Sequence, residues 1–275
     1  MKARRWIPLA FNAVWTASIF ILTGCATVPV TGRHQLSLVS AGQEMQLGLS
    51  SFDQLKKETP INHDPAINDR VQRVGKRIAA VAGKDLPNAQ WEFVVFESTE
   101  ANAFCLPGGK VGVYTGILQV TKDDAGLATV IGHEVGHAVA HHGAERMSEA
   151  MVIQTGGQLL GTSISAADPR WQEITLLAYG AGTKLGRELP HSRAQESEAD
   201  HIGIIYLARA GYDPKAAVEF WQRFSDYNQQ HGGGKNSPLA GFLSTHPLDQ
   251  TRIQQLQNWL PEAEQARSQA QSQTQ

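Results

Sequence analysis

Two histidines four residues apart, His133 and His137, constrain the fold of this chain more than any other feature, because they enclose Glu134 in the pattern H-E-x-x-H. On a helix, residues four apart lie one above the other on the same face. Both imidazoles can then reach one Zn²⁺ ion at about 2.0–2.1 Å, and Glu134 can lie close to a metal-bound water. Asp123 can cap a helix that runs to about His142. The pattern predicts a helix that carries a catalytic zinc.

The third metal ligand is expected from a later helix. Glu196 and Asp200 are four residues apart and share a helix face. Glu196 can bind the metal while Asp200 supports a ligand histidine from behind. Glu198 is the main rival for the ligand role, and a solvated acidic face is the simpler alternative. A catalytic zinc takes three protein ligands and keeps one open position, so we expect one ion per chain.

Glycine at two positions of the first helix indicates close packing. Gly132 and Gly136 each cost about 1 kcal/mol of helix stability relative to alanine, which suggests that another element packs close to this helix. His142 lies two and a half turns after His133 if the helix continues, on the opposite face. We therefore expect His141 and His142 to be helix-surface residues.

The rest of the pattern predicts a predominantly helical α+β domain with a small antiparallel sheet. An apolar helical face begins after Asp64-Pro65 and ends at Gly83, and strands are expected at 91–96 and 110–115, joined through a turn at 107–109. Further helices are expected near 123–142, 144–160, 169–186, 192–210, 214–227 and 248–259. We expect a glycine-rich mobile loop at 228–245 and a disordered tail at 261–275.

The N-terminus has the pattern of a bacterial lipoprotein leader. Basic residues at positions 2, 4 and 5 precede an apolar stretch from about Ile7 to Leu22, and Leu22-Thr23-Gly24-Cys25 resembles a lipobox. Residues 1–24 are then a signal peptide, Cys25 carries the lipid, 25–60 form a tether and leading segment, and 61–260 form the metallopeptidase domain. An ordinary signal peptide or an uncleaved anchor helix is the alternative. Ala26 favours the outer membrane, which places the chain on its periplasmic face.

The charge and the cysteine content argue against two classes of protein, nucleic-acid binders and disulfide-stabilised scaffolds. The formal net charge is -2 and charged residues make up 18% of the 275 residues, which does not indicate a nucleic-acid partner. Cys105 has no intramolecular partner if Cys25 is lipidated, so no disulfide framework is possible. We expect Cys105 to be buried and inert, with a reactive or intermolecular thiol as the alternative.

These motifs together resemble the membrane-associated gluzincin metallopeptidases, a family that includes the HtpX and CAAX prenyl proteases and the periplasmic BepA- and LoiP-type lipoproteins. The segments 102–104, 107–109 and 244–247 add to the resemblance, which covers roughly residues 30–260. It implies a zincin-like fold, with His133, His137 and Glu196 as zinc ligands and Glu134 as general base.

The resemblance leaves two roles open. In periplasmic relatives, a histidine at the position of His246 can approach the metal and block its open position, or assist the transition state. A surface histidine that caps Pro247 is the alternative. Arg252 can orient a carboxylate of the site or form an ion pair on the surface.

The predicted function is zinc-dependent endopeptidase of the bacterial cell envelope. Its substrates would be unfolded or misassembled periplasmic and outer-membrane proteins, bound as extended strands along a sheet edge. One alternative is a latched and mainly non-proteolytic assembly or chaperone factor for outer-membrane proteins. Another is a purely structural zinc site, which would need four protein ligands and would leave Glu134 without a role beside the metal.

Overall fold

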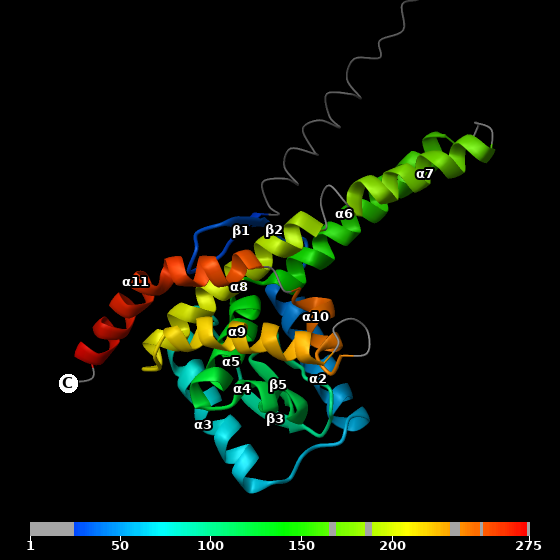
Figure 1. Ribbon diagram of the computed structural model, residues 1–275. Coiled ribbons are helices and arrows are strands. Elements are labelled where there is room, and N and C mark those ends of the chain that lie inside the picture. The colour runs from blue at the N-terminus through cyan, green and yellow to red at the C-terminus, as the bar shows by residue number, and fades with distance from the viewer. Residues whose placement is uncertain (1–24, 165–168, 185–188, 232–236, 248–249, 274–275) are drawn as a thin grey trace, which may run out of the picture.

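Helices dominate the computed structural model, which describes residues 25–164, 169–184, 189–231, 237–247 and 250–273 (Figure 1). The predicted signal peptide lies outside these residues. The helices are α2 (Ala41–Glu58), α3 (Pro65–Ala82), α4 (Leu118–Thr121), α5 (Asp124–Val139), α6 (His142–Ser163), α7 (Pro169–Thr183), α8 (Leu189–Arg209), α9 (Lys215–Gln230), α10 (Ala240–Thr245) and α11 (Gln250–Ser272), with a 3-10 turn η1 (Thr115–Ile117). The predominantly helical α+β class is confirmed.

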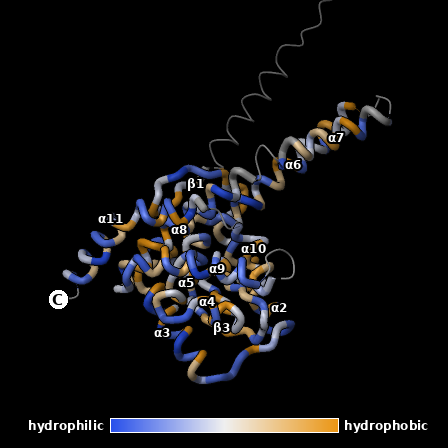
Figure 2. The backbone as a smooth tube through the Cα atoms, in the orientation of Figure 1, coloured by the Kyte–Doolittle hydropathy of each residue, from blue (hydrophilic) through white to orange (hydrophobic). Residues whose placement is uncertain are grey.

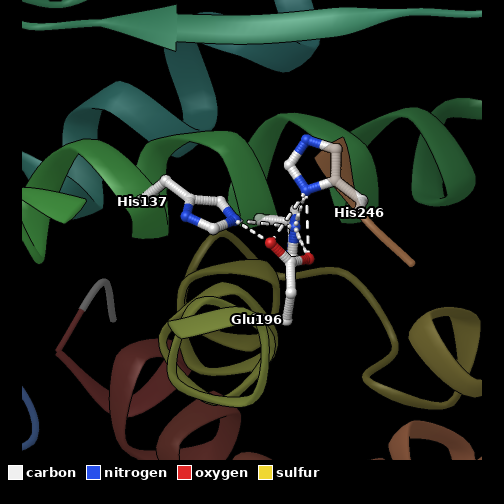
Figure 3. Close-up of side chains that lie close together, drawn as sticks. His137, Glu196 and His246 are labelled. Carbon is white, nitrogen blue, oxygen red and sulfur yellow. Dashed lines mark hydrogen bonds and ion pairs between the residues drawn. The ribbon is translucent and has the colours of Figure 1, made fainter. Parts of the chain in front are cut away.

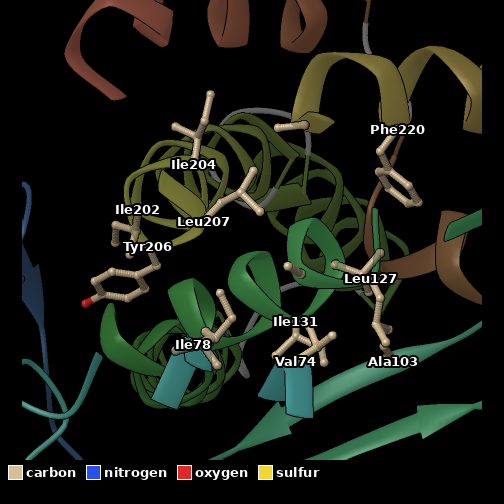
Figure 4. Close-up of a cluster of buried hydrophobic side chains, with 14 of the residues drawn as sticks. Val74, Ile78, Ala103, Leu127, Ile131, Ile202, Ile204, Tyr206, Leu207 and Phe220 are labelled. Atoms are coloured by element: carbon tan, nitrogen blue, oxygen red, sulfur yellow. The ribbon is translucent and has the colours of Figure 1, made fainter. Parts of the chain in front are cut away.

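The hydrophobic core lies where α5 meets α3 and α8 (Figure 4). Val74 and Ile78 of α3 and Ile131 of α5 are no more than 1% exposed. The apolar face predicted for α3 is the face that packs on α5. Asp64 begins this helix, because its side chain accepts hydrogen bonds from the amides of the first turn. Burial on this scale fixes α5 in the centre of the protein.

The sheet at residues 92–114 is mixed, and the prediction of an antiparallel sheet was wrong in this respect. Its strands are β3 (Glu92–Phe96), β4 (Ala103–Leu106) and β5 (Lys110–Tyr114), in the order β3-β5-β4. β4 and β5 form an antiparallel hairpin, whereas β3 runs parallel to β5. The sequence analysis did not include β4. The extra strand adds a second reversal of the chain, so β3 and β5 point the same way.

The segment expected to be a tether packs on the domain. Strands β1 (Cys25–Thr27) and β2 (His34–Leu36) pair antiparallel, and the turn between them buries Val28 completely. α2 follows and starts with a capping box formed by Ser40 and Gln43. The leading segment is therefore part of the folded structure.

The tail predicted to be disordered continues α11 as far as Ser272, straight through Pro261. Ala263 is fully buried, and Leu260 and Ala266 pack against the core. Residues three apart share a helix face, so these side chains form a short apolar stripe that a polar composition conceals. The prediction of a disordered tail was wrong because it rested on the polar composition of residues 261–275 and not on the helical spacing of their apolar residues.

Helices occupy part of the predicted mobile loop 228–245. α9 extends to Gln230 and α10 occupies Ala240–Thr245, while residues 232–236 lie outside the described part of the chain. α6 and α7 extend away from the remaining helices as a pair (Figure 1). Among the described residues, no helix is both long and apolar enough to cross a bilayer.

Candidate metal centre

The whole H-E-x-x-H segment lies in helix α5 and is buried. Asp123 caps its first turn by accepting a hydrogen bond from the amide of Gly126. His133, Glu134 and His137 are 2%, 4% and 8% exposed. Polar groups at this depth need partners, because an unpaired buried polar group costs free energy. Helix α8 supplies partners for His133 and His137.

Helix α8 lies against α5 with almost no side chain between the two backbones. A Cβ atom on Gly136 would lie 2.8 Å from the carbonyl oxygen of Ala199, and one on Gly132 would lie 3.1 Å from that of Gly203. The two glycines of α5 are therefore required by this approach, as the sequence analysis expected. The close contact brings Glu196, one turn before Ala199 on α8, beside both histidines of α5.

Four side chains each bring one donor atom to a common point: His133, His137, Glu196 and His246. Figure 3 shows three of them meeting between α5 and α8. His133 Nε2 is 3.1 Å from His137 Nε2 and 3.4 Å from Glu196 Oε2, and His137 Nε2 is 3.2 Å from Glu196 Oε1. Ligand atoms about 2.05 Å from a tetrahedral ion lie about 3.3 Å apart. The three separations between His133, His137 and Glu196 are close to this value, so these side chains could hold a tetrahedral metal ion.

His246 supplies the fourth donor, from the residue that follows α10. Its Nδ1 is 3.2 Å from His133 Nε2 and 3.0 Å from Glu196 Oε2. The side chain is 9% exposed, so it is not the surface histidine of the alternative interpretation. His246 therefore lies directly beside His133 and Glu196, two of the three predicted ligands.

Glu134 lies beside the four donors and is not one of them. Its Oε1 is 3.4 Å from His246 Nε2 and has no hydrogen-bond partner within the described residues. Burial raises the pKa of Glu134 above its usual value, although the neighbouring His246 and His133 oppose the shift. A carboxylate with a raised pKa is a stronger base, which suits proton transfer near neutral pH.

Asp200 and Arg252 hold His133 from behind. Asp200 Oδ1 is 2.9 Å from His133 Nδ1, and Arg252 donates to both oxygens of Asp200 at 2.7 and 2.8 Å. Arg252 also lies over the ring of Trp221, 3.7 Å from its centroid, and 3.3 Å from Glu196 Oε2. Burial opposes ionisation of Asp200, but Arg252 and His133 hold its pKa below the usual range. This arrangement fixes the orientation of the His133 ring.

A second chain of buried polar groups holds His137, and the sequence analysis missed it. His137 Nδ1 is 2.8 Å from His142 Nδ1, and His142 Nε2 is 2.9 Å from Glu198 Oε2. Arg33 donates to Glu198 through its Nε at 2.8 Å and also pairs with Glu145 at 2.7 Å. Glu198 is therefore directed away from the four donors, toward His142.

The placement of His142 on the helix surface was wrong. His142 is fully buried. α5 ends at Val139, and His141 adopts a left-handed backbone with φ of 53°. The chain therefore turns before His142, and the helical phase counted from His133 no longer applies. A histidine five residues after His137 and a glutamate two after Glu196 were the only signals in the sequence.

Cys105 is half-buried on β4, beside the site. Burial and the nearby charge of Glu134 raise the pKa of its thiol far above the usual value. A thiol that stays protonated is a poor nucleophile and a poor metal ligand. These observations favour an inert cysteine.

Comparison with known proteins identifies the family. Residues 65–260 match the family model described as Peptidase family M48. The chain is 33% identical to the mitochondrial metalloendopeptidase OMA1 of Schizosaccharomyces pombe, over 96% of this chain and 74% of that protein. It is 31% identical to human metalloendopeptidase OMA1, over 89% and 48% respectively. It is 29% identical to the β-barrel assembly-enhancing protease of Escherichia coli, over 84% and 47%. The chain therefore belongs to peptidase family M48 and is a metalloendopeptidase.

Proposed function

We propose that this protein is a zinc-dependent endopeptidase in which His133, His137 and Glu196 bind the ion and Glu134 is the general base. The spacing of the donor atoms carries the proposal, because it matches a tetrahedral ion while a buried carboxylate stands next to the site. When bound, zinc would polarise the scissile carbonyl and lower the pKa of water toward about 7. Glu134 takes the proton of the attacking water and delivers it to the leaving amine.

Replacing Glu134 with glutamine tests this mechanism. The Glu134→Gln variant keeps the shape of the side chain and should retain one zinc per chain, while cleavage of an unfolded polypeptide should fall by at least about 10²-fold, the lower range for general-base catalysis. Glu262→Gln serves as a control, because Glu262 is an exposed carboxylate that pairs with His201. Cleavage by the Glu134→Gln variant at the rate of the control would refute the role of Glu134.

The position of His246 favours a second candidate, a peptidase whose site is latched. His246 Nδ1 lies within hydrogen-bonding distance of Glu196, and its Nε2 lies near Glu134. A substrate carbonyl that approaches the metal must displace this ring. The His246→Ala variant should then cleave an unfolded polypeptide several-fold faster than the wild type. Equal rates of cleavage would refute the latch. No cleavage by either protein, with zinc bound, would favour an assembly or holding role.

The substrate is proposed to be an extended polypeptide. β4 is one of the two edge strands of the sheet and contacts α5, so a peptide could add to the sheet beside Glu134. Recognition through the backbone selects for exposure and extension rather than for one sequence. Unfolded chains should therefore be cleaved, and the same chains in their folded state should resist. Equal cleavage of both would refute strand addition.

We also propose that the protein acts at the periplasmic face of the outer membrane, held there by a lipid on Cys25. The leader pattern supports the anchor, and the Escherichia coli relative is described as a β-barrel assembly-enhancing protease. Misassembled envelope proteins would be the substrates. Mass spectrometry of the mature N-terminus tests the anchor. An acylated Cys25 that is lost in Cys25→Ser supports it, and an N-terminus without acyl groups refutes it.

A further inference from the structure

Exposed apolar side chains are concentrated on one part of the protein. We define the arm as residues 150–163 of α6 together with α7, the pair of helices that extends away from the domain (Figure 1). Eight large apolar side chains are exposed in the described part of the chain, and two of them, Leu38 and Leu47, lie elsewhere. The other six lie on the arm: Met151, Val152, Leu159, Ile174, Leu176 and Leu177. Apolar residues mark the outer part of the arm (Figure 2).

The α6 part of the arm has no charged side chain, and its exposed amide side chains are Gln154 and Gln158. No charged residue occurs between Glu149 and Asp168 in the sequence. The hydroxyls of Thr155, Thr162 and Ser163 donate to carbonyls one turn earlier in α6, at 2.8–2.9 Å. Tyr179 of α7 donates its hydroxyl to the carbonyl of Ile153 at 2.9 Å. Groups paired within the helices can leave water at little cost.

The arm and the proposed lipid attachment site share one side of the protein. The base of α6 contacts β2, where the amide of Leu38 donates to Ser148 Oγ at 2.8 Å. β2 pairs with β1, which begins at Cys25, and the apolar stretch of the leader precedes that residue. Arg146 and Lys184 are exposed at the base of the arm, where cations can meet anionic lipid headgroups.

We propose that the arm is a membrane-contacting element that lies in the interface of a lipid bilayer. Its exposed apolar side chains would enter the boundary between headgroups and acyl chains. Glu173 is exposed near the tip, so the arm lies along the surface and does not enter tip first. The inference uses the proposed anchor at Cys25 only to decide which side of the protein faces the lipid.

Depth-dependent quenching tests this proposal on the full chain. A polarity-sensitive dye is attached to Met151→Cys or Leu159→Cys, and the protein is bound to vesicles of phosphatidylcholine and phosphatidylglycerol. Leu47→Cys on α2 is the matched control, because Leu47 and Met151 are 48% and 47% exposed. The labelled wild-type chain gives the background from Cys105 and from any Cys25 that carries no lipid. Lipids brominated in the acyl chain should quench both arm probes at least twofold more than the control.

Three results would overturn the proposal. Equal quenching of the arm and control probes would place the arm in water. A dye shift that appears without vesicles and vanishes on dilution would assign the arm to a second copy of the chain. Hydrogen exchange on the unlabelled wild type guards against misfolded variants, because vesicles should slow arm amides at least threefold and leave those of α2 unchanged. An unchanged arm would contradict the proposal. None of these readouts needs peptidase activity, so they fail or succeed independently of the proposed function.

Discussion

Replacing Glu198 with glutamine tests the buried polar network that supports His137. This network runs from Arg33, in the turn between β1 and β2, through Glu198 and His142 to His137. The Glu198 carboxylate accepts from His142 Nε2 at 2.9 Å and from Arg33 Nε at 2.8 Å. Glutamine has nearly the same shape, but it has no charge to pair with Arg33. The Glu198→Gln variant should therefore be less stable than the wild type and should hold His137 less firmly.

The pKa of Glu198 sets the size of the effect. Burial opposes ionisation, but hydrogen bonds from His142, Thr31 and Arg33 lower its pKa from 4.5 to about 2. A pKa lowered from 4.5 to about 2 on folding corresponds to about 3 kcal/mol of unfolding free energy at pH 7. Because the folded-state pKa is depressed, this contribution is complete above about pH 4.5 and is lost as the pH falls toward 2. About 1.4 kcal/mol should remain at pH 3.

Urea unfolding of the metal-free protein at pH 7 and pH 3 measures this difference. Glu262→Gln is the control, because Glu262 is 57% exposed and its ion pair with His201 should contribute no more than about 1 kcal/mol. The metal affinity of Glu198→Gln should also fall about 10- to 100-fold, as for other groups that orient ligand histidines. A stability difference that stays constant between pH 7 and pH 3 would refute the electrostatic argument.

Three further predictions concern the site. Gly136→Ala should lower the free energy of unfolding by about 1–3 kcal/mol, because its Cβ would lie 2.8 Å from the carbonyl oxygen of Ala199. Chemical denaturation measures this change. The control is Gly161→Ala, which meets no atom within 4 Å and should be neutral or stabilising. Arg252→Lys should weaken zinc binding about tenfold in competition with a chelating dye, because lysine cannot donate to both oxygens of Asp200; an unchanged affinity would contradict the role given to Arg252. Chelation should lower the melting temperature, since zinc at 100 times its dissociation constant stabilises by about 2.7 kcal/mol; zinc should restore it and calcium should not.

Local periodicity made much of the centre predictable. The spacing of His133 and His137 identifies the central helix, and the spacing of Glu196 and Asp200 identifies its partner, because side chains four apart share a face wherever the helix is placed. The structure brings His133, His137 and Glu196 together with His246, and it places Asp200 against the far nitrogen of His133. Gly136 also signalled the close approach of a second helix, through its cost to helix stability.

Interruptions of regular structure were not predictable in the same way. The role of His142 depends on the left-handed backbone of His141, which ends one helix before the next begins. Arg33 reaches Glu198 across 165 residues of sequence, and no local pattern encodes such a contact. The direction of β3 depends on one short strand, β4, whose four residues lack a clear alternation. Contacts between distant segments, rather than propensity, decided these features.

The direct backbone contact between α5 and α8 limits how the metal centre can move. His133 and His137 are carried by one helix and Glu196 by the other, and no side chain between them at Gly132 and Gly136 could rearrange to change their separation. His246 belongs to neither helix. If His246 occludes the proposed zinc site, opening it requires displacement of only the segment that carries His246, and His133, His137 and Glu196 keep their mutual geometry.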